Sequence, residues 1–419
     1  MERPFGLYIH IPFCVRKCRY CDFLSAPADA EVRHAYASAL CGEIRQVGTM
    51  LKTEKAHMPV CDTIFIGGGT PTTLDPSDLA MIMDCIYGSF FVLPDAEITM
   101  EMNPGTYSNQ MLSFAGKYLN RVSIGLQSAQ NEELLMLGRI HTYEDFEMCY
   151  EALRGIGISN INVDLMSGIP GQTLRGWEET LLKVTSLDPD HISAYSLIVE
   201  EGTPFYELNE RGELDLPDED TEREMYRLTE TILSRAGYKR YEISNYAKEG
   251  RACRHNTRYW KREPYLGFGI GAASLYGKLT IPAGIQLSWK SQRADDLFNK
   301  SSGQYRRTNT SDLKAYIERC GGTGSKAWEK EVPEDGSLVT ELTIREAIEE
   351  YMFLGLRMTE GISKQDFYDQ FGMPIDEMYG KVITSFIAEG LLKCRGNRIF
   401  LTERGLDLGN TVMAEFLLD

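Results

Sequence analysis

The sequence predicts an α/β protein built on an incomplete barrel of six strand–helix units, with smaller regions appended to it. Two observations predict this class. Apolar segments rich in β-forming residues alternate with stretches of helical periodicity in the first half of the chain, as in a parallel sheet covered by helices. The 419 residues also exceed what one hydrophobic core usually organises. We therefore predict four regions, at residues 1–240 (barrel), 241–300 (β-rich extension), 301–340 (linker with one short helix) and 341–419 (C-terminal domain).

Six segments are predicted as barrel strands, at residues 6–11, 62–68, 97–104, 121–128, 161–168 and 191–198. Residues 173–187 illustrate the helical partner, because Leu174, Trp177, Leu181 and Val184 are spaced by three and four residues and share one face. Ligands of such sheets gather at the carboxyl ends of the strands. We expect the functional site at that edge.

The composition changes beyond residue 240. Residues 242–274 are rich in aromatic residues and glycine, which predicts short strands or loops. Within the linker, residues 312–320 predict a short helix. From Glu341 a helical pattern returns, and residues 381–405 predict a helix followed by a hairpin, as in a winged helix.

The charge balance disfavours nucleic acid as a partner. The 44 basic and 61 acidic residues give a net charge of −17, whereas phosphate backbones are bound by clustered Lys and Arg. Residues 341–419 hold 8 basic and 14 acidic residues, a net charge of −6, so the winged helix is not expected to bind DNA. The sequence has neither a signal peptide nor an apolar run that could cross a bilayer, which predicts a soluble cytoplasmic protein with reduced thiols.

Three of the ten cysteines, Cys14, Cys18 and Cys21, form a C-x3-C-x2-C motif that is far too compact to be expected by chance. Zinc normally requires four protein ligands, so a zinc site would have to recruit His10 as the fourth. A [4Fe–4S] cluster is also usually held by four cysteines, and three would leave one iron open to a small molecule that offers an amine and a carboxylate. S-adenosylmethionine (SAM) offers both, so we favour the cluster.

The other seven cysteines are predicted to be small buried apolar side chains, with the role of Cys253 left open. They are Cys41, Cys61, Cys85, Cys149, Cys253, Cys320 and Cys394.

The motif and its surroundings resemble the radical-SAM superfamily. YIHIPFC, KCRYCDF and GGGTPT are similar to the branch that contains oxygen-independent coproporphyrinogen III dehydrogenase and the haem chaperones, and the resemblance covers nearly the whole chain. It implies the partial (βα)6 barrel, the winged-helix-like C-terminal domain, the cluster and SAM.

The resemblance also implies which residues hold SAM. It places Tyr8 near the carboxylate and Tyr20 near the adenine, and Gly68, Gly69 and Thr70 near the amine. Glu101, Gln127 and Asp164 are polar groups in or at the ends of apolar strands, where an unpaired carboxylate or amide would be costly. Taken alone they could bond to loop backbone. The resemblance assigns them to the ribose and methionine end, and Arg139 to the carboxylate.

A second motif, HNTRYW, holds His255, Asn256, Tyr259 and Trp260. Imidazole is a usual axial ligand of haem iron, and aromatic side chains provide apolar walls for a porphyrin, although a single histidine is more often structural. The motif matches the haem site of the chaperones at every fixed position. Many of those relatives carry histidine where this chain has Ala273, so a second histidine contact to haem is not expected here.

Two functions remain open at this stage. The first is a haem chaperone that delivers haem to acceptor apoproteins, with membrane-associated respiratory proteins and a second copy of the chain as candidate partners. The second is an enzyme that decarboxylates coproporphyrinogen III. We favour the chaperone because of HNTRYW, because only 13 residues precede Cys14, and because Phe23 stands where the dehydrogenase has a further cysteine. A fold of this kind hosts many functions.

Overall fold

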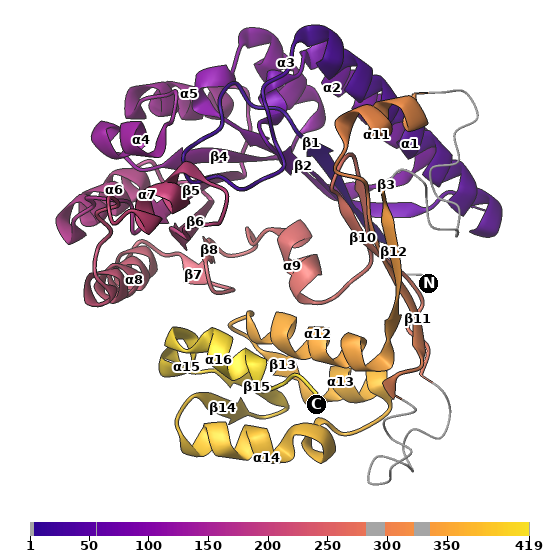
Figure 1. The fold of residues 1–419 in the computed structure, drawn as a ribbon, viewed down its shortest axis with the longest axis vertical. Helices are drawn as coiled ribbons and strands as arrows, with labels where there is room; N and C mark the ends of the chain where they lie inside the picture. Colours follow the sequence, from indigo (N-terminus) through magenta and orange to yellow (C-terminus); the bar gives the residue numbers. More distant parts are fainter. Residues whose placement is uncertain (1–3, 56, 282–297, 322–335, 419) are drawn as a thin grey trace.

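The computed structural model describes residues 4–55, 57–281, 298–321 and 336–418. Its centre is a strongly curved sheet of twelve strands in the order β12-β11-β10-β9-β1-β2-β3-β4-β5-β6-β8-β7, with helices around its outer face (Figure 1). Strands β1 to β6 are neighbours in chain order and run parallel. This is the topology of the predicted six-unit partial barrel, and the sheet stays open in the described residues.

The strands of the large sheet have the following bounds: β1 Phe5–Ile11, β2 Val60–Gly68, β3 Phe91–Met102, β4 Arg121–Gln127, β5 Ile161–Ser167, β6 His191–Ser196, β7 Lys239–Arg240, β8 Asn245–Ala247, β9 Tyr265–Phe268, β10 Ala273–Gly277, β11 Ser301–Thr308 and β12 Leu338–Thr343. The helices that accompany it are α1 Ala30–Lys55, α2 Pro76–Ser89, α3 Asn109–Tyr118, α4 Asn131–Leu137, α5 Tyr143–Gly155, α6 Leu174–Ser186, α7 Pro204–Glu210, α8 Glu219–Arg235, α9 Arg254–Trp260 and α11 Leu313–Cys320, with short 3-10 turns at Pro71–Thr73 and Pro104–Thr106.

The barrel elements follow from their sequences. Six of the seven residues of β1 are buried, as expected for a parallel strand covered on both faces. Helix α6 begins after Thr173, whose side chain accepts the backbone N–H of Gly176, and its predicted face buries Trp177 completely. All six predicted strands are confirmed. The third begins earlier than predicted, because residues 91 and 92 already pair with β2 ahead of a register shift.

Two predictions for the middle of the chain were wrong. Residues 301–308, assigned to a linker, form β11, which pairs with β10 and β12 and extends the large sheet. The HNTRYW motif, expected in strands or loops, lies on helix α9, which occupies the open side of the sheet's curve (Figure 1). In both cases long-range packing overrode the local composition. The remaining parts of the predicted extension and linker, 282–297 and 322–335, lie outside the described residues.

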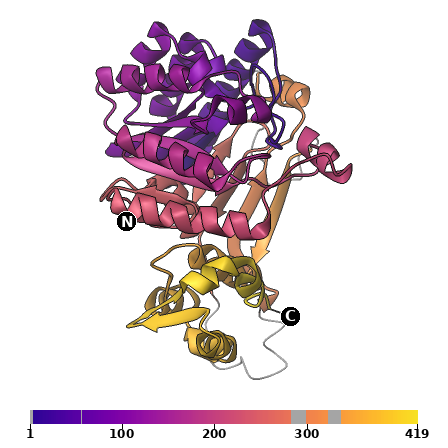
Figure 2. The same ribbon diagram turned by 90° about the vertical axis from the view of Figure 1, so that its left-hand side faces the viewer.

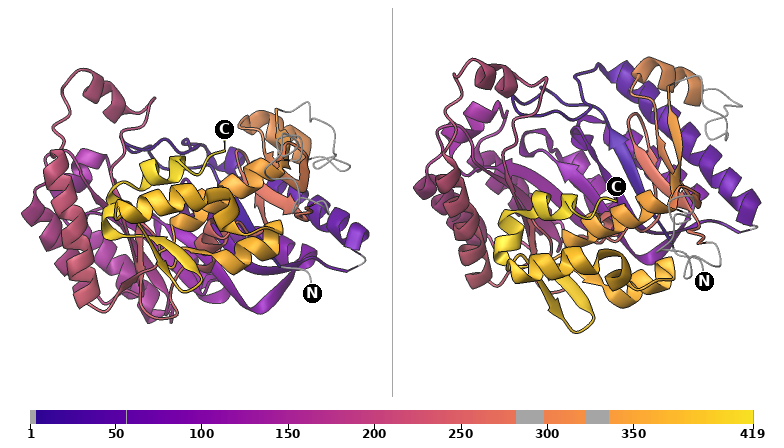
Figure 3. Two further views of the ribbon diagram at one scale, coloured as in Figure 1. Left: turned by 90° about the horizontal axis from the view of Figure 1, so that it is seen from below. Right: turned by 60° about the horizontal axis from the view of Figure 1, so that its bottom comes forward.

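The C-terminal domain has its own core and lies on the open side of the curved sheet, next to α9 and the edge strands β11 and β12 (Figures 2 and 3). It consists of α12 Ile344–Leu356, β13 Ile362–Ser363, α13 Lys364–Phe371, α14 Ile375–Ala388, β14 Leu392–Arg395, β15 Arg398–Leu401, α15 Glu403–Asp407 and α16 Gly409–Ala414. The order of helices and the three-stranded sheet β13-β15-β14 are those of a winged helix, as predicted.

Several polar contacts fasten this domain to the barrel, among them the following two. The Arg262 Nε donates to Glu350 at 2.8 Å, and the Thr359 N–H donates to the Tyr241 carbonyl at 3.0 Å. A separate finding concerns membranes: among the described residues, no helix combines the length and apolarity needed to span one.

Candidate functional site

The three cysteines of the C-x3-C-x2-C motif lie on the loop after β1 and line one cavity of about 160 Å³. This cavity, called the cluster cavity below, lies where the sequence places it, at the carboxyl ends of the strands. Its wall contains most of the residues predicted to hold SAM. They are Tyr20, Gly68, Gly69, Thr70, Glu101, Gln127, Arg139 and Asp164.

The cysteine loop is held in place by backbone contacts. The Cys14 N–H donates to the Ala26 carbonyl at 3.3 Å, which closes the base of the loop. Farther along, the Arg19 N–H donates to the Leu137 carbonyl at 3.0 Å, which attaches the loop to the end of α4. The half-buried thiols are therefore carried by a fixed loop.

The geometry fits a cluster better than a single metal ion. Among the described residues, no three His, Cys, Asp or Glu side chains stand close enough together for one ion. His10, the fourth ligand that zinc would need, is engaged at both ring nitrogens, by the Tyr8 hydroxyl and by the Leu24 carbonyl, each at 3.0 Å. A [4Fe–4S] cluster binds each cysteine to a different iron, so it requires thiols around a cavity and not around a point.

The thiols would bind that cluster as thiolates. Burial raises the pKa of both Cys14 and Cys21, and the neighbouring Cys18 raises both further. Positive metal charge at this place reverses the effect, because a coordinating thiol is deprotonated. The donor set therefore fits the cluster that the sequence predicts.

The glycine run lies at the end of β2 and contacts the end of β1, where the Gly69 N–H donates to the Ile11 carbonyl at 2.9 Å. Gly68 has a φ of +113°, and its N–H donates to Glu101 Oε2 at 2.9 Å. A Cβ on Gly69 would lie 2.5 Å from the Phe13 carbonyl oxygen. At Gly68 the backbone conformation disfavours any side chain, and at Gly69 the backbone that follows β1 leaves no room for one.

We expect Gly69→Ala to destabilise the protein by about 1–3 kcal/mol, because the added methyl group overlaps backbone that cannot move aside. SAM binding should weaken with it, since the loop borders the cluster cavity. Chemical denaturation and SAM titration measure the two effects. Gly88→Ala is the control, because nothing lies within 4 Å of its added Cβ. Equal stability of the two variants would contradict the prediction.

Glu101, Asp164 and Gln127 meet at the floor of the cluster cavity. Burial and the nearby Asp164 raise the pKa of Glu101 to about 8, and burial also raises the pKa of Asp164. Gln127 has a φ of +76° at a register shift between β4 and β5, and such a bulge re-aims a side chain. Strain of this kind collects at functional sites.

Arg139 is turned partly away from the role that the resemblance implies. Its Nη2 donates to the Gly125 carbonyl at 2.6 Å, and its Nη1 lies 3.7 Å from Cys18 Sγ. Its Nε is buried without a hydrogen-bond partner among the described residues. The guanidinium lies on the wall of the cluster cavity, so its positive charge stands beside any ligand bound there.

A second cavity of about 490 Å³, called the central cavity below, adjoins the cluster cavity. Its walls share several residues with it, among them Tyr20, Glu101, Gln127 and Asp164. Tyr8 lines only the central cavity, so the structure places it farther from the cysteines than Tyr20. His255, Asn256 and Tyr259 of the HNTRYW motif line the same cavity, and the two predicted constellations therefore share one space.

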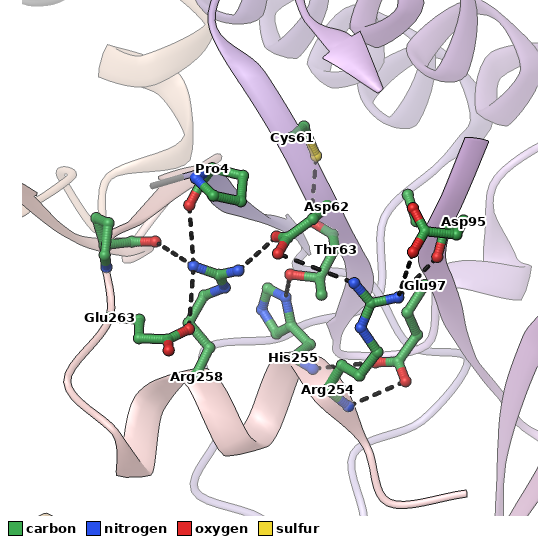
Figure 4. A network of polar contacts seen from close by, with 12 residues as sticks. Pro4, Cys61, Asp62, Thr63, Asp95, Glu97, Arg254, His255, Arg258 and Glu263 are labelled. Carbon is green, nitrogen blue, oxygen red and sulfur yellow. Dashed lines mark hydrogen bonds and ion pairs between the residues drawn. The ribbon is translucent and has the colours of Figure 1, made fainter. Parts of the chain in front are cut away.

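Helix α9 is fixed to the edge of the barrel by charged contacts (Figure 4). The Glu97 carboxylate accepts the backbone N–H groups of Arg254 and His255, each at 3.0 Å, at the start of the helix. Arg258 forms an ion pair with Asp62 on β2 and donates to the Pro4 carbonyl at 3.0 Å. These residues were not predicted from the sequence, although charged residues such as Glu97 and Asp62 within apolar strand segments are a signal for them.

The His255 ring is buried and bonded at both nitrogens. Its Nδ1 lies 2.9 Å from Thr63 Oγ1, its Nε2 lies 2.8 Å from the Tyr259 hydroxyl, and Phe65 stacks on the ring at 5.4 Å between centroids. Burial, followed by the charges of Arg258 and Arg121, lowers the pKa of His255 to about 3. The imidazole is neutral at physiological pH, which is the form that binds metal.

The structure separates Trp260 from the other motif residues. It lines a different cavity, of about 310 Å³, between the end of α9 and the C-terminal domain, and the Arg357 guanidinium lies 4.4 Å from its ring centroid. Residues 271–274 do not line the central cavity.

The scattered cysteines mostly follow the prediction. Cys253 is fully buried, donates to Glu97 at 3.5 Å, and has its pKa raised to about 12 by burial, so it remains a structural thiol. Cys85 is only half-buried, and Cys394 is exposed on β14, where the prediction of burial was wrong.

Comparison with known proteins agrees with this geometry. The Radical SAM superfamily model matches residues 8–184, and the HemN C-terminal domain model matches residues 342–408. The heme chaperone HemW of Bacillus subtilis is 37% identical over 412 residues, covering 98% of both chains. That of Lactococcus lactis is 33% identical over 420 residues, covering 100% of this chain and 99% of the relative.

Among solved structures, coproporphyrinogen III oxidase (HemN) from Escherichia coli matches with a TM-score of 0.77 at 21% identity, covering 99% of this chain and 90% of that one. At that identity the match supports the fold alone. The sequence matches along the whole chain favour the chaperone over the decarboxylase. The chain therefore belongs to the radical SAM superfamily and, within it, to the family of the heme chaperone HemW.

Proposed function

We propose that this protein binds haem in the central cavity through His255 and transfers it to acceptor apoproteins. The observation that carries the proposal is a buried, neutral imidazole on the wall of a cavity that adjoins the cluster cavity. A volume of about 490 Å³ lies within the range of small-molecule and cofactor sites. Membership in the family implies the [4Fe–4S] cluster, SAM and haem as the associated cofactors.

The residues around His255 suit an exchangeable ligand. Thr63 holds Nδ1 and sets the orientation of the ring, while Nε2 is bonded only to a tyrosine hydroxyl that can rotate away. Iron coordination at Nε2 would replace that single hydrogen bond. Tyr259 and Phe65 supply aromatic surface beside the ring.

Cys14, Cys18 and Cys21 would hold the cluster, which can supply an electron to the SAM sulfonium when both are bound. For SAM itself, Glu101, Gln127 and Asp164 would accept the ribose and ammonium donors, Arg139 would bind the carboxylate, and Tyr20 would contact the adenine. The loop of Gly68, Gly69 and Thr70 would let the methionine end approach the backbone.

The position of Phe23 supports a chaperone over a coproporphyrinogen III dehydrogenase. Its side chain is 60% exposed and lies on the walls of both cavities. A phenyl ring there offers apolar contact to a macrocycle and no thiol for chemistry. We propose a cytoplasmic protein that meets its acceptors, and a second copy of itself, through surfaces outside these cavities.

His255→Ala is expected to abolish stoichiometric haem binding in anaerobically reconstituted protein, because it removes the axial nitrogen. Haem titration followed by Soret absorbance measures the loss. Tyr259→Phe keeps the aromatic ring and frees Nε2, so it should bind haem at least as tightly as the wild type. His34→Ala, on the outer helix α1, is the histidine control.

An unchanged Soret titration in His255→Ala would overturn the proposed ligand. A parallel incubation with coproporphyrinogen III, SAM and reductant tests the enzyme alternative. Protoporphyrinogen formed at many turnovers per chain would replace the chaperone by the decarboxylase.

A further inference from the structure

Arg121 is a buried cation without a bonded partner. It is the first residue of β4, its side chain lines the central cavity, and the residue is only 1% exposed. Its Nε has no hydrogen-bond partner, and its guanidinium forms no ion pair, among the described residues. Leaving a buried charge unpaired is costly, so such a group is retained for a reason.

The other buried arginines differ from Arg121, because their side chains have bonded partners. Of the described residues, Arg258, Arg262 and Arg307 are the remaining arginines below one tenth exposure. Each of them has a nearby acceptor: Arg258 pairs with Asp62, Arg262 bonds to Glu350 at 2.8 Å, and Arg307 bonds to Asn309 at 3.1 Å. Of these four arginines, only Arg121 lines the central cavity.

The carboxylates nearest Arg121 are engaged elsewhere. Glu97 accepts the first amides of α9, and Asp164 accepts Ser123 Oγ at 3.1 Å and Asn162 Nδ2 at 2.7 Å. Burial lowers the pKa of Arg121, but the acidic groups around it, Cys253, Glu97, Tyr241 and Asp164, together raise it above the ordinary value, so the guanidinium stays charged. It keeps donors free to bind a ligand.

Arg121 differs in charge from the other ionisable residues on the wall of the central cavity. Among the described residues that line the cavity, Arg121 is the only Arg or Lys, whereas Asp22, Glu101, Asp164 and Glu200 are acidic. It stands at the amino end of β4, with Gln127 and the cluster cavity at the other end. It also lies near His255, whose pKa its charge helps to lower.

We propose that Arg121 is the anion anchor of the central cavity and binds a propionate carboxylate of the tetrapyrrole whose iron His255 coordinates. This rests on the proposed function. A haem carries its two carboxylates on one edge of a flat apolar ring. The His255 imidazole would bind the iron and the Arg121 guanidinium would bind a carboxylate at that edge, so the ligand would be recognised at two points. The planar guanidinium matches a carboxylate through two parallel hydrogen bonds. Arg121 thereby selects a macrocycle with a free acid.

The test compares haem with haem dimethyl ester, in which both carboxylates are masked. Reconstituted wild-type protein, Arg121→Met and Arg121→Lys are titrated with each ligand by Soret absorbance. Wild type should bind haem about tenfold to hundredfold more tightly than the ester, the range for a charge-assisted hydrogen bond. Arg121→Met should bind both ligands with the affinity that wild type has for the ester, and Arg121→Lys should restore part of the preference.

Two further measurements separate recognition from a structural role. The haem-free, cluster-loaded Arg121→Met protein should keep its iron content and unfold in a single cooperative transition, because the Arg121 Nε donates no hydrogen bond among the described residues. SAM affinity should not change. A selective loss of SAM affinity would assign Arg121 to the SAM carboxylate instead and overturn the proposal.

The remaining outcomes are equally decisive. If wild type binds haem and ester equally while His255→Ala still abolishes both, Arg121 is not the anchor and the proposed function stands. If Arg121→Met lowers both affinities by the same factor and lowers thermal stability, its role is structural. The wild-type comparison with the ester needs no variant, so it decides the proposal even if Arg121→Met does not fold.

Discussion

Replacing Cys18 by serine should reduce the iron and sulfide content of anaerobically reconstituted protein from about four of each per chain to nearly none. The three thiols line a single small cavity. Three cysteines already leave one iron of the cluster without a protein ligand. The loss of Cys18 would leave a second iron without one, and two cysteines seldom retain a cluster. Cys18 is also the thiol nearest Arg139, so its loss removes the contact between the cysteine loop and that side chain. Iron and acid-labile sulfide assays measure the result, and the visible charge-transfer absorption should disappear with them.

Cys394→Ser is the matched control, because this thiol is exposed on β14 in the C-terminal domain. It should leave four irons and four sulfides in place. Stoichiometric zinc without sulfide in the wild type would contradict the cluster, and so would full iron retention in Cys18→Ser. The three-cysteine variant Cys14→Ser, Cys18→Ser, Cys21→Ser repeats the test if serine at one position still binds metal.

The stability of SAM-free protein should fall as the pH rises from about 4.5 to about 8, because of Glu101. Burial and Asp164 raise the pKa of this carboxyl to about 8 in the folded protein, whereas an unfolded chain ionises it near 4.5. Between these values the native state binds more protons than the unfolded state, so each pH unit lowers the free energy of unfolding by roughly 1.4 kcal/mol. The stabilisation is complete below about 4.5 and lost above about 8.

Glu101→Gln should flatten this dependence, because the amide keeps the shape of the protonated acid and does not titrate. Denaturant melts of both proteins at pH 5.5, 7 and 8.5, in low salt, measure the difference. SAM affinity should fall about tenfold to hundredfold in the variant, since an ionised carboxylate accepts hydroxyl and ammonium donors more strongly than an amide. In the wild type, that affinity should weaken below pH 8.

If the stability of Glu101→Gln and of wild type depended on pH in the same way, the pKa of the Glu101 carboxyl would not be raised in the folded protein, and the prediction would be wrong. Glu133→Gln provides a control outside the pair of Glu101 and Asp164. The Glu133 carboxylate accepts hydrogen bonds from Ser128 and Gln172 and not from that pair. It should leave SAM affinity unchanged. A drop equal to that of Glu101→Gln would contradict a specific role for Glu101.

The sequence predicted the barrel strands and the cluster loop well, because both are local patterns. A continuous apolar run such as β1 can be stable only as a covered strand, and a C-x3-C-x2-C motif constrains its thiols to one loop. Residues 301–308 were mispredicted because a polar segment becomes a strand only when β10 and β12 offer it hydrogen bonds. Helix α9 was missed because its seven residues are held by Glu97 and Asp62 from distant strands.

By itself, the sequence determined which chemical groups this protein carries: three clustered cysteines, a glycine run after a strand, and a histidine among aromatic residues. Only the tertiary structure decided how they combine. It joined the cluster cavity to the cavity of His255, turned Trp260 toward the C-terminal domain, and left Arg121 charged and unbonded inside the barrel. The physical reason is that burial and the distance between charges depend on strands far apart in the chain, and these two quantities set whether a side chain is paired, neutral or free to bind a ligand.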